Sequence, residues 1–319
     1  MDGRLRGRRV SDPRATTAVR RTTAVGLTVG APGGTDLLPD DTRMSAVTLH
    51  AGDLAALAAY YRDAVGLVTL AEGEGQEVLG RGRTPVLVLR HTPGLPTPAR
   101  NQAGLFHTAI LFEDEASLAA AVLSTARHPL SRYVGSADHL VSEAFYFTDP
   151  EGNGIELYVD RPREQWQVLD GQVQMDSLFL DPQRYLETHL TETAAAGLHD
   201  AAASVGHVHL QVGDIPMARE FYADALGFAV TMQVPGALFV SAGGYHHHLA
   251  VNVWNSRGAG PRASTLGLGE VTIAVPTRDE LDAAAARLRA RGIAVADDGR
   301  SLSADDPWRN RVTLQLADA

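Results

Sequence analysis

Histidines and one glutamate recur at equivalent places in short runs that alternate between apolar and other residues. His107 in LFHTAILF and His207 in VGHVHLQV both take the third position of such a run, and Glu156 lies in GNGIELYVD. Histidine titrates near neutral pH and is the commonest metal ligand. Alternation of this kind indicates β-strands, whose side chains point to opposite faces in turn. We therefore expect these three side chains to be carried on strands.

Together His107, His207 and Glu156 form a set of two imidazoles and one carboxylate. Such a set leaves coordination positions open around a metal ion and is typical of non-haem Fe(II) oxygenases. The same ligands also suit Mn(II) and Zn(II), so the ligand types leave the metal open. A single histidine is more often structural than a ligand, but three such groups at matching strand positions favour a metal site.

A further run, GGYHHHLAVNVW, places three histidines side by side, and apolar residues follow them. If this run is one strand, His246 and His248 share a face and His247 points to the other. The run is therefore a candidate site, although a buried histidine that bonds to the backbone is the commoner role of any one histidine.

The elements that must position these groups follow an internal repeat. VTLHAGDLAALAAYYRDAVGL from Val47 and VHLQVGDIPMAREFYADALGF from Val208 align in register, and each predicts a strand, an aspartate at a helix start, and an amphipathic helix that ends before a glycine. Two further segments follow the same plan, so the chain predicts four βαβββ modules. We expect an α+β protein with a first domain over residues 44–160, a mostly helical connector over 161–204, and a second domain over 205–319.

The bulk composition narrows the class of protein. Hydrophobic residues make up 45% and charged residues 21% of the 319, as in soluble globular proteins, and no apolar run is long enough to span a membrane. The formal charge of −10 argues against a nucleic-acid partner, and the absence of cysteine excludes disulfides, thiolate ligands and a cysteine nucleophile. Residues 1–43 are read as a disordered extension or a mis-assigned start, and the weak apolar stretch after Arg20 and Arg21 favours a cytoplasmic protein over an exported one.

From about Met44 onward the sequence resembles the vicinal oxygen chelate superfamily, on the strength of GHVHLQVGDIPMAREFYADALGF and DPEGNGIELY. The surroundings of the ligands resemble most its type I extradiol ring-cleaving dioxygenases, of the catechol 2,3-dioxygenase kind. This resemblance implies paired βαβββ modules that form barrels, with Fe(II), or alternatively Mn(II), on His107, Glu156 and His207. It also implies that His247, in the match YHHHLAV, is an active-site histidine whose neighbour His246 faces away.

The family carries a further histidine and tyrosine before the glutamate. Tyr146 matches the tyrosine, and His139 matches the histidine, although the interval between them is two residues shorter than the family pattern. A core role for Tyr146 and a loop-capping role for His139 stay open. His209 would be a neighbour of the ligands or line the pocket, and Asn252, Trp254 and Arg262 would line a substrate mouth.

The order of the modules departs from the usual one, because the module with the glutamate precedes the module with the single histidine ligand. Pairing of modules in sequence order would separate His107 and Glu156 from His207. We therefore expect modules two and three to pair around the metal, and module one to pair with module four, where Ala46, Glu270 and Thr313 replace the ligands.

The resemblance implies that a catechol-type substrate is opened with O2 to a hydroxymuconic semialdehyde, as in aromatic hydrocarbon catabolism. His247, His139 and Tyr146 would be the catalytic residues, and the protein could form a homo-oligomer. Two alternatives remain. The first is a glyoxalase-like isomerase or lyase, which usually takes a metal-binding carboxylate from both paired modules. Module three is expected to carry histidines at that place, which counts against this alternative. The second is a metal-free drug-binding protein, which would lack the three ligands.

Overall fold

The structure, a computed structural model, describes residues 37–317. Of the extension expected over residues 1–43, residues 1–36 lie outside this described part. Within it, the predicted order of strand, helix and three strands occurs four times. Module one comprises β1 (Arg43–Ala51), α1 (Leu54–Tyr60), the π-helix η1 (Tyr61–Val65), β2 (Val68–Gly73), β3 (Gln76–Arg81) and β4 (Thr84–His91). Module two comprises β5 (Gly104–Phe112), α2 (Glu115–Arg127), β6 (Arg132–Asp138), β7 (Ser142–Thr148) and β8 (Gly154–Asp160).

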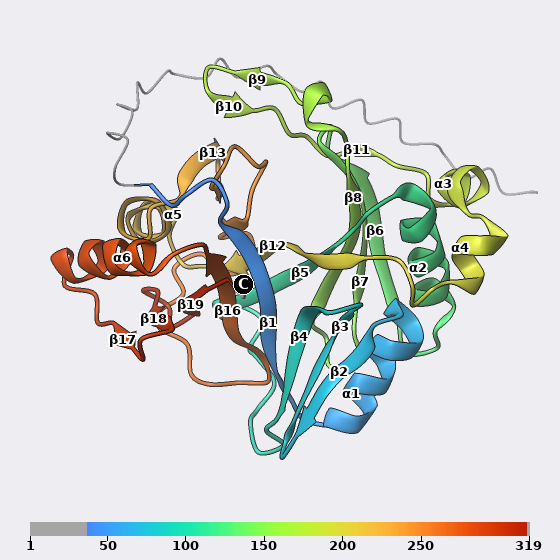
Figure 1. The fold of residues 1–319 in the computed structure, drawn as a ribbon, viewed down its shortest axis with the longest axis horizontal. Helices are drawn as coiled ribbons and strands as arrows, with labels where there is room; N and C mark the ends of the chain where they lie inside the picture. Colours follow the sequence, from blue (N-terminus) through green and yellow to red (C-terminus); the bar gives the residue numbers. More distant parts are fainter. Residues whose placement is uncertain (1–36, 318–319) are drawn as a thin grey trace, which may run out of the picture. The chain divides into compact units, whose positions relative to one another are not determined.

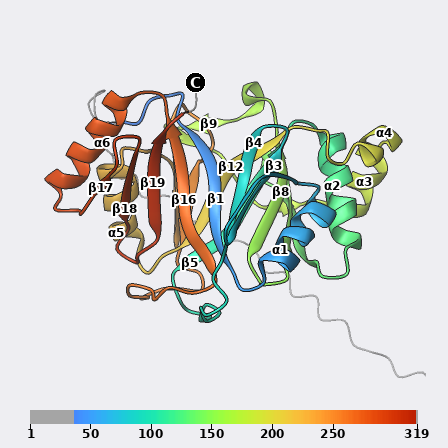
Figure 2. The same ribbon diagram turned by 60° about the horizontal axis from the view of Figure 1, so that its bottom comes forward.

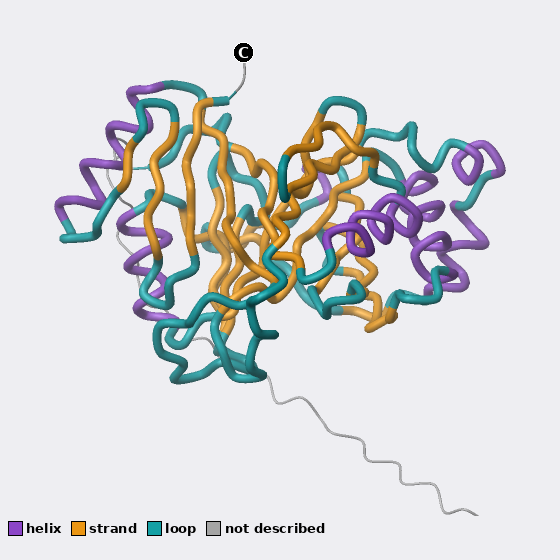
Figure 3. The backbone as a smooth tube through the Cα atoms, turned by 90° about the horizontal axis from the view of Figure 1, so that it is seen from below, coloured by secondary structure: helices purple, strands orange, loops and turns teal. Residues whose placement is uncertain are grey.

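The second half of the chain repeats this order. Module three comprises β12 (Ala203–Gln211), α5 (Ile215–Arg219), the π-helix η3 (Glu220–Ala225), β13 (Ala229–Val234), β14 (Ala237–Ser241) and β15 (Leu249–Asn252). Module four comprises β16 (Gly267–Val275), α6 (Arg278–Ala290), β17 (Ala296–Asp297), β18 (Ser301–Asp305) and β19 (Arg311–Leu316). Figure 3 shows the helices of these modules outside the strands.

The connector between β8 and β12 is helical only in its second half. It begins with a 3-10 turn, η2 (Arg163–Gln165), and the short strands β9 (Val168–Leu169), β10 (Gln172–Val173) and β11 (Leu178–Phe179). The helices α3 (Pro182–His189) and α4 (Glu192–Ala196) follow. Gly171 adopts a positive φ between β9 and β10, which turns the chain into a hairpin instead of a helix.

The repeated aspartates start the helices, as predicted. Asp53, Asp114 and Asp214 each accept a hydrogen bond from the backbone N–H three residues on, and Thr277 does the same for α6. These contacts satisfy N–H groups that have no partner within the helix. The capping residue therefore fixes the position at which the helix begins after the first strand of its module.

The strands form two large sheets whose middles are module interfaces. In the sheet β17-β18-β19-β16-β1-β4-β3-β2, β1 pairs antiparallel with β16, so modules one and four join (Figure 2). In the sheet β11-β6-β7-β8-β5-β12-β15-β14-β13, β5 pairs antiparallel with β12, so modules two and three join (Figure 1). The predicted pairing of two with three and of one with four is confirmed. A large apolar core fills the space between strands and helices, and a smaller cluster of Ala109, Ala144 and Tyr158 lies apart from it.

Two buried aspartates tie the modules in a second way. Asp149, in the turn DPEGNG, accepts hydrogen bonds from the Tyr61 hydroxyl of module one and from the backbone N–H and side-chain amide of Asn153. Asp306 repeats this pattern in module four with Tyr222 of module three and Asn310. Modules that share no sheet are thus joined through these turns. No helix in the described part is long and apolar enough to cross a membrane.

Candidate metal centre

The three predicted ligands meet at the interface of modules two and three. His107 lies on β5 and His207 on β12, the two strands that pair antiparallel at the centre of the sheet. Glu156 lies on β8, which pairs parallel to β5 on its other side. Its Oε2 is 2.9 Å from Nε2 of His107 and 3.1 Å from Nε2 of His207. One ligand atom of each residue lies within 4.8 Å of the others, and all three residues are buried.

The charges of this cluster suit a divalent cation. Burial alone would raise the pKa of Glu156, but His207 and His107 lower it well below its usual value, so the carboxylate is anionic at neutral pH. Burial lowers the pKa of His207 to about 4, although Glu156 opposes the shift. A neutral imidazole keeps a lone pair for coordination. The cluster therefore offers an anionic carboxylate and a neutral nitrogen donor from His207, with His107 as the second imidazole.

The hydrogen bonding of the cluster also fits a metal ion. Nε2 of His107 is buried and makes no hydrogen bond of acceptable geometry, although it lies close to Glu156. Buried polar atoms without a partner are uncommon in folded proteins. The two imidazoles and one carboxylate match the ligands of Fe(II), Mn(II) and Zn(II) sites. His107, Glu156 and His207 thus form a metal-binding triad.

His139 and Tyr146 lie next to the triad. Nε2 of His139 is 2.6 Å from the Tyr146 hydroxyl, and its Nδ1 is 2.7 Å from the backbone oxygen of Asp176 in the connector. The carbonyl accepts from Nδ1–H, so Nε2 accepts from the hydroxyl. Burial, and secondarily the charge of Glu156, raise the pKa of Tyr146 well above its usual value. The short interval between His139 and Tyr146 therefore still brings the two side chains together.

The three adjacent histidines do not lie in a strand, so that prediction is wrong. Gly243 and Gly244 adopt positive φ and turn the chain, and β15 begins only at Leu249. Strand alternation therefore does not apply. The expectation that His246 faces away from His247 is also wrong, because their Nδ1 atoms are 2.8 Å apart.

His247 and His248 have different surroundings. The His247 ring lies 4.1 Å from the His207 ring between centroids. Burial lowers the pKa of His247 well below its usual value, and His207 and His246 add to the effect. His248 instead accepts a hydrogen bond at Nδ1 from the backbone N–H of Ala242. His247 thus packs closely on a metal ligand, the ring of His246 lies farther from His207, with 5.8 Å between centroids, and His248 holds the turn.

Aromatic side chains lie beside the ligand His107. Phe106 and His209 lie beside His107, with ring centroids 5.3 Å and 5.0 Å away, and Trp254 lies 5.4 Å from both Phe106 and His209. Asn252 donates a hydrogen bond to Nε2 of His209. Phe106 is not among the site residues predicted from the sequence, although its position next to the candidate ligand His107 could have indicated it. The Arg262 guanidinium lies elsewhere, where it donates to the backbone oxygen of Leu268.

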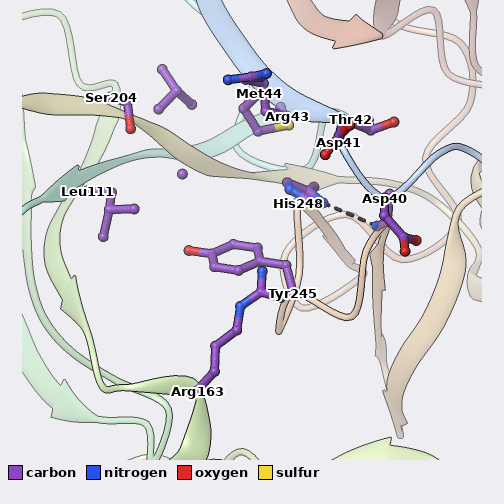
Figure 4. Close-up of a pocket in the computed structure, with 13 residues that line it drawn as sticks. Asp40, Asp41, Thr42, Arg43, Met44, Leu111, Arg163, Ser204, Tyr245 and His248 are labelled. Atoms are coloured by element: carbon purple, nitrogen blue, oxygen red, sulfur yellow. Dashed lines mark hydrogen bonds between the residues drawn. The ribbon is translucent and has the colours of Figure 1, made fainter. Parts of the chain in front are cut away.

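A separate pocket of about 320 Å³ borders the turn with the three histidines. Tyr245, His248 and Arg163 line it together with residues 40–44, and Figure 4 shows the Tyr245 ring beside Arg163. None of the three triad residues lines this pocket.

Residues 204–312 match the family model of the Glyoxalase/Bleomycin resistance protein/Dioxygenase superfamily. Over 274 residues the chain is 36% identical to a catechol-2,3-dioxygenase of Bacillus subtilis (strain 168), and the match covers 84% of this chain and 95% of that protein. The chain belongs to this superfamily. It is homologous to an enzyme.

Solved structures of the superfamily fold agree with this membership. A candidate dioxygenase from Bacillus subtilis superposes with a TM-score of 0.60 at 11% identity, covering 87% of this chain and 86% of that one. Glyoxalase I from Zea mays gives a TM-score of 0.54 at 17% identity, covering 86% and 92%. At these identities the likeness concerns the fold of the superfamily only.

Strand pairing locates the place of Glu156 in the other modules. Glu156 lies opposite Ala109, two residues after His107, and the equivalent pairs are His209 with Ala250 and Thr272 with Thr313. The prediction of Thr313 in module four is confirmed. The expectation of a histidine in module three is wrong, because the late start of β15 puts Ala250 there.

Proposed function

We propose that the protein is an extradiol ring-cleaving dioxygenase that opens a catechol-type substrate with O2 to a hydroxymuconic semialdehyde. The observation that carries this proposal is the single buried triad of His107, Glu156 and His207 with polar groups on two sides. His139 and Tyr146 lie on one side of it, and His247 lies on the other. The homology to a catechol-2,3-dioxygenase supports it further.

We further propose that the triad holds Fe(II), with Mn(II) as the alternative. When bound, such an ion supplies open coordination positions at which two reactants can meet in one geometry. The chain's part is to hold the three ligands on paired strands, with their ligand atoms within 4.8 Å of one another.

Tyr146 and His139 would hold a substrate oxygen. The Tyr146 hydroxyl is fixed by His139, which is itself fixed by the backbone of Asp176. A hydroxyl placed in this way can stabilise negative charge that develops on an oxygen of the ring. The raised pKa of Tyr146 keeps its hydroxyl protonated at neutral pH, and this proton would turn from Nε2 of His139 to the substrate oxygen when the substrate binds.

His247 would exchange a proton with the substrate. It is neutral, buried and packed on His207, so it lies within reach of a hydroxyl bound at the triad. A neutral imidazole with a free lone pair can accept that proton and return it later. Phe106 and Trp254 provide aromatic faces beside the triad for a flat substrate.

A glyoxalase-like isomerase or lyase is the weaker candidate. Such an enzyme usually takes a carboxylate from both paired modules, and Ala250 occupies the place equivalent to Glu156 in module three. A metal-free binding protein has no use for the triad.

The test is reconstitution of the protein with Fe(II) under anaerobic conditions, followed by catechol and air. The expected result is a yellow product that forms with iron and does not form when the iron is removed by a chelator before catechol is added. The His207→Ala variant is the control, because it should bind no iron and give no colour. Bound iron without ring cleavage of catechol or of several substituted catechols would overturn the proposal and favour the isomerase or lyase.

A further inference from the structure

A chain of hydrogen bonds runs from His247 away from the triad. Nδ1 of His247 is 2.8 Å from Nδ1 of His246, and Nε2 of His246 is 2.9 Å from Oδ1 of Asp160. Asp160 ends β8, the strand that carries Glu156, so the chain of contacts returns to module two. The His246 side chain is completely buried, whereas the Asp160 side chain is 22% exposed.

The position of each proton in this chain follows from the chemistry of its last member. An ionised carboxylate only accepts hydrogen bonds, so Nε2 of His246 must carry a proton. With a single proton on its ring, held at Nε2, His246 has Nδ1 as an acceptor. Nδ1 of His247 must then donate, and Nε2 of His247 keeps its lone pair.

We propose that Asp160 and His246 are positioning residues that hold His247 in the tautomer with an unprotonated Nε2. This is the tautomer that a proton acceptor facing a substrate hydroxyl needs. The inference rests on the proposed function for its purpose, but the tautomer is a property of the protein itself.

The surroundings hold the chain in one arrangement. The Tyr245 hydroxyl donates to Oδ2 of Asp160 at 2.8 Å, and the Tyr158 hydroxyl lies 2.7 Å from that of Tyr245. Since the proton of Tyr245 is used on Asp160, Tyr158 donates to Tyr245. Both oxygens of Asp160 are therefore occupied, and the carboxylate cannot rotate without losing a bond.

Packing restricts His246 in the same way. Its ring centroid lies 4.1 Å from that of Tyr245 and 5.2 Å from that of Trp166 in the connector. Its backbone oxygen accepts a hydrogen bond from the Thr231 hydroxyl at 2.7 Å. His246 is thus clamped by ring contacts and by its own backbone, which is what a positioning residue requires.

The first test is nitrogen-15 NMR of the metal-free protein, which reports which ring nitrogen of His247 carries the proton. We expect the Nδ1–H form in the wild type. In the Asp160→Asn variant the side-chain amide can donate to Nε2 of His246. The proton of His246 then moves to Nδ1 and is donated to Nδ1 of His247, so every hydrogen bond of the series is reversed and His247 takes the Nε2–H form. The Nε2–H form in the wild type, or an unchanged tautomer in Asp160→Asn, would overturn the proposal.

The second test is steady-state kinetics with Fe(II) and catechol. We expect Asp160→Asn to lower kcat by about 100-fold, at the lower end of the contribution of a positioned acid or base, with little change in KM or in bound iron. Asp160→Glu keeps an acceptor-only group and should restore the wild-type tautomer and part of kcat. An Asp160→Asn variant that keeps the wild-type kcat would contradict the proposal.

The Asp297→Asn variant is the matched control, because it also removes one carboxylate charge. The Asp297 side chain is 21% exposed and bonds to Arg278 in module four, away from the triad. It should change neither the tautomer nor kcat. If the wild type cleaves no catechol, the proposed function fails, while the NMR result still decides the role of Asp160.

Discussion

Tyr61 of module one donates a hydrogen bond of 2.9 Å to Asp149 of module two, although these modules share no pair of strands in the described sheets. Tyr222 and Asp306 repeat the contact at 2.8 Å between modules three and four. Sheet pairing joins one with four and two with three, so each module is fastened to two others.

Removing either tyrosine hydroxyl should destabilise the protein. Tyr61→Phe leaves a buried carboxylate with one hydrogen bond fewer, and hydrogen bonds to charged groups contribute about 1.5–3 kcal/mol. Tyr222→Phe should cost a similar amount, and the double variant should show the sum, because the two sites are separate. Urea denaturation measures this. A loss below about 0.5 kcal/mol in both single variants would show that the ties contribute little.

Metal binding should depend on module position and not on residue type alone. His107→Ala should abolish tight binding of Fe(II), since it removes one of three ligands. Glu270→Ala alters the equivalent place in module four, where Thr313 stands for Glu156, and should leave metal content unchanged. Metal analysis after dialysis distinguishes them. Equal loss in both variants would place the ion outside the triad.

His247 and His248 should separate catalysis from structure. His247→Ala should retain iron but lower kcat for catechol by about 10²–10⁴, the range for a positioned acid or base. His248→Gln should keep kcat within a few-fold, because His248 bonds to the turn at Ala242. If instead His248→Gln lost most of kcat and His247→Ala kept it, His248 would be the catalytic histidine and His247 the structural one.

Tyr146→Phe should lower kcat more than it raises KM, because the hydroxyl is proposed to act on developing charge. The Fe(II) content should match that of the wild type. A core role for Tyr146 predicts instead a loss of thermal stability with normal kcat, which thermal denaturation of the same variant would reveal.

Stability of the metal-free protein should fall with acidity below pH 6.5. Burial lowers the pKa of His207 to about 4 and that of His248 to about 3, from an ordinary value of 6.5. Between these values the unfolded chain binds protons that the folded chain does not. The contribution of these histidines to the free energy of unfolding is therefore complete above pH 6.5 and is lost as the pH falls toward 4 for His207 and toward 3 for His248. Each such histidine contributes a slope of about 1.4 kcal/mol per pH unit in this window. His248→Gln should remove the contribution of one histidine, about 1.4 kcal/mol per pH unit, from the measured slope. An unchanged slope would contradict this prediction.

The sequence predicts the modules and the triad because their signals are local or repeated. The aspartates that start the helices, such as Asp53 and Asp214, stand at one place in three of the four copies, and Thr277 takes that place in the fourth. The pairing of modules two and three follows from requiring His107, Glu156 and His207 to meet in one site. A ligand set distributed over two modules constrains how those modules can pack.

Other features depend on contacts between distant residues or on exceptions to strand geometry. Gly243 and Gly244 interrupt the expected strand with positive φ angles, and His246 and His247 lie in contact with each other instead of on opposite faces. Asp160 ends an ordinary strand, and its partner His246 is 86 residues away, so nothing beside it in the sequence marks a role. The actual start of β15 likewise decides that Ala250 takes the place expected for a histidine.

The nested pairing of the modules also sets an order of assembly during synthesis. Modules two and three are neighbours along the chain and can complete their sheet, with the triad, before module four leaves the ribosome. β1 is made first among the strands but waits for β16, the first strand of the last module, and until then it has an open edge. The sheet that carries the triad can therefore form before the sheet that joins modules one and four is complete.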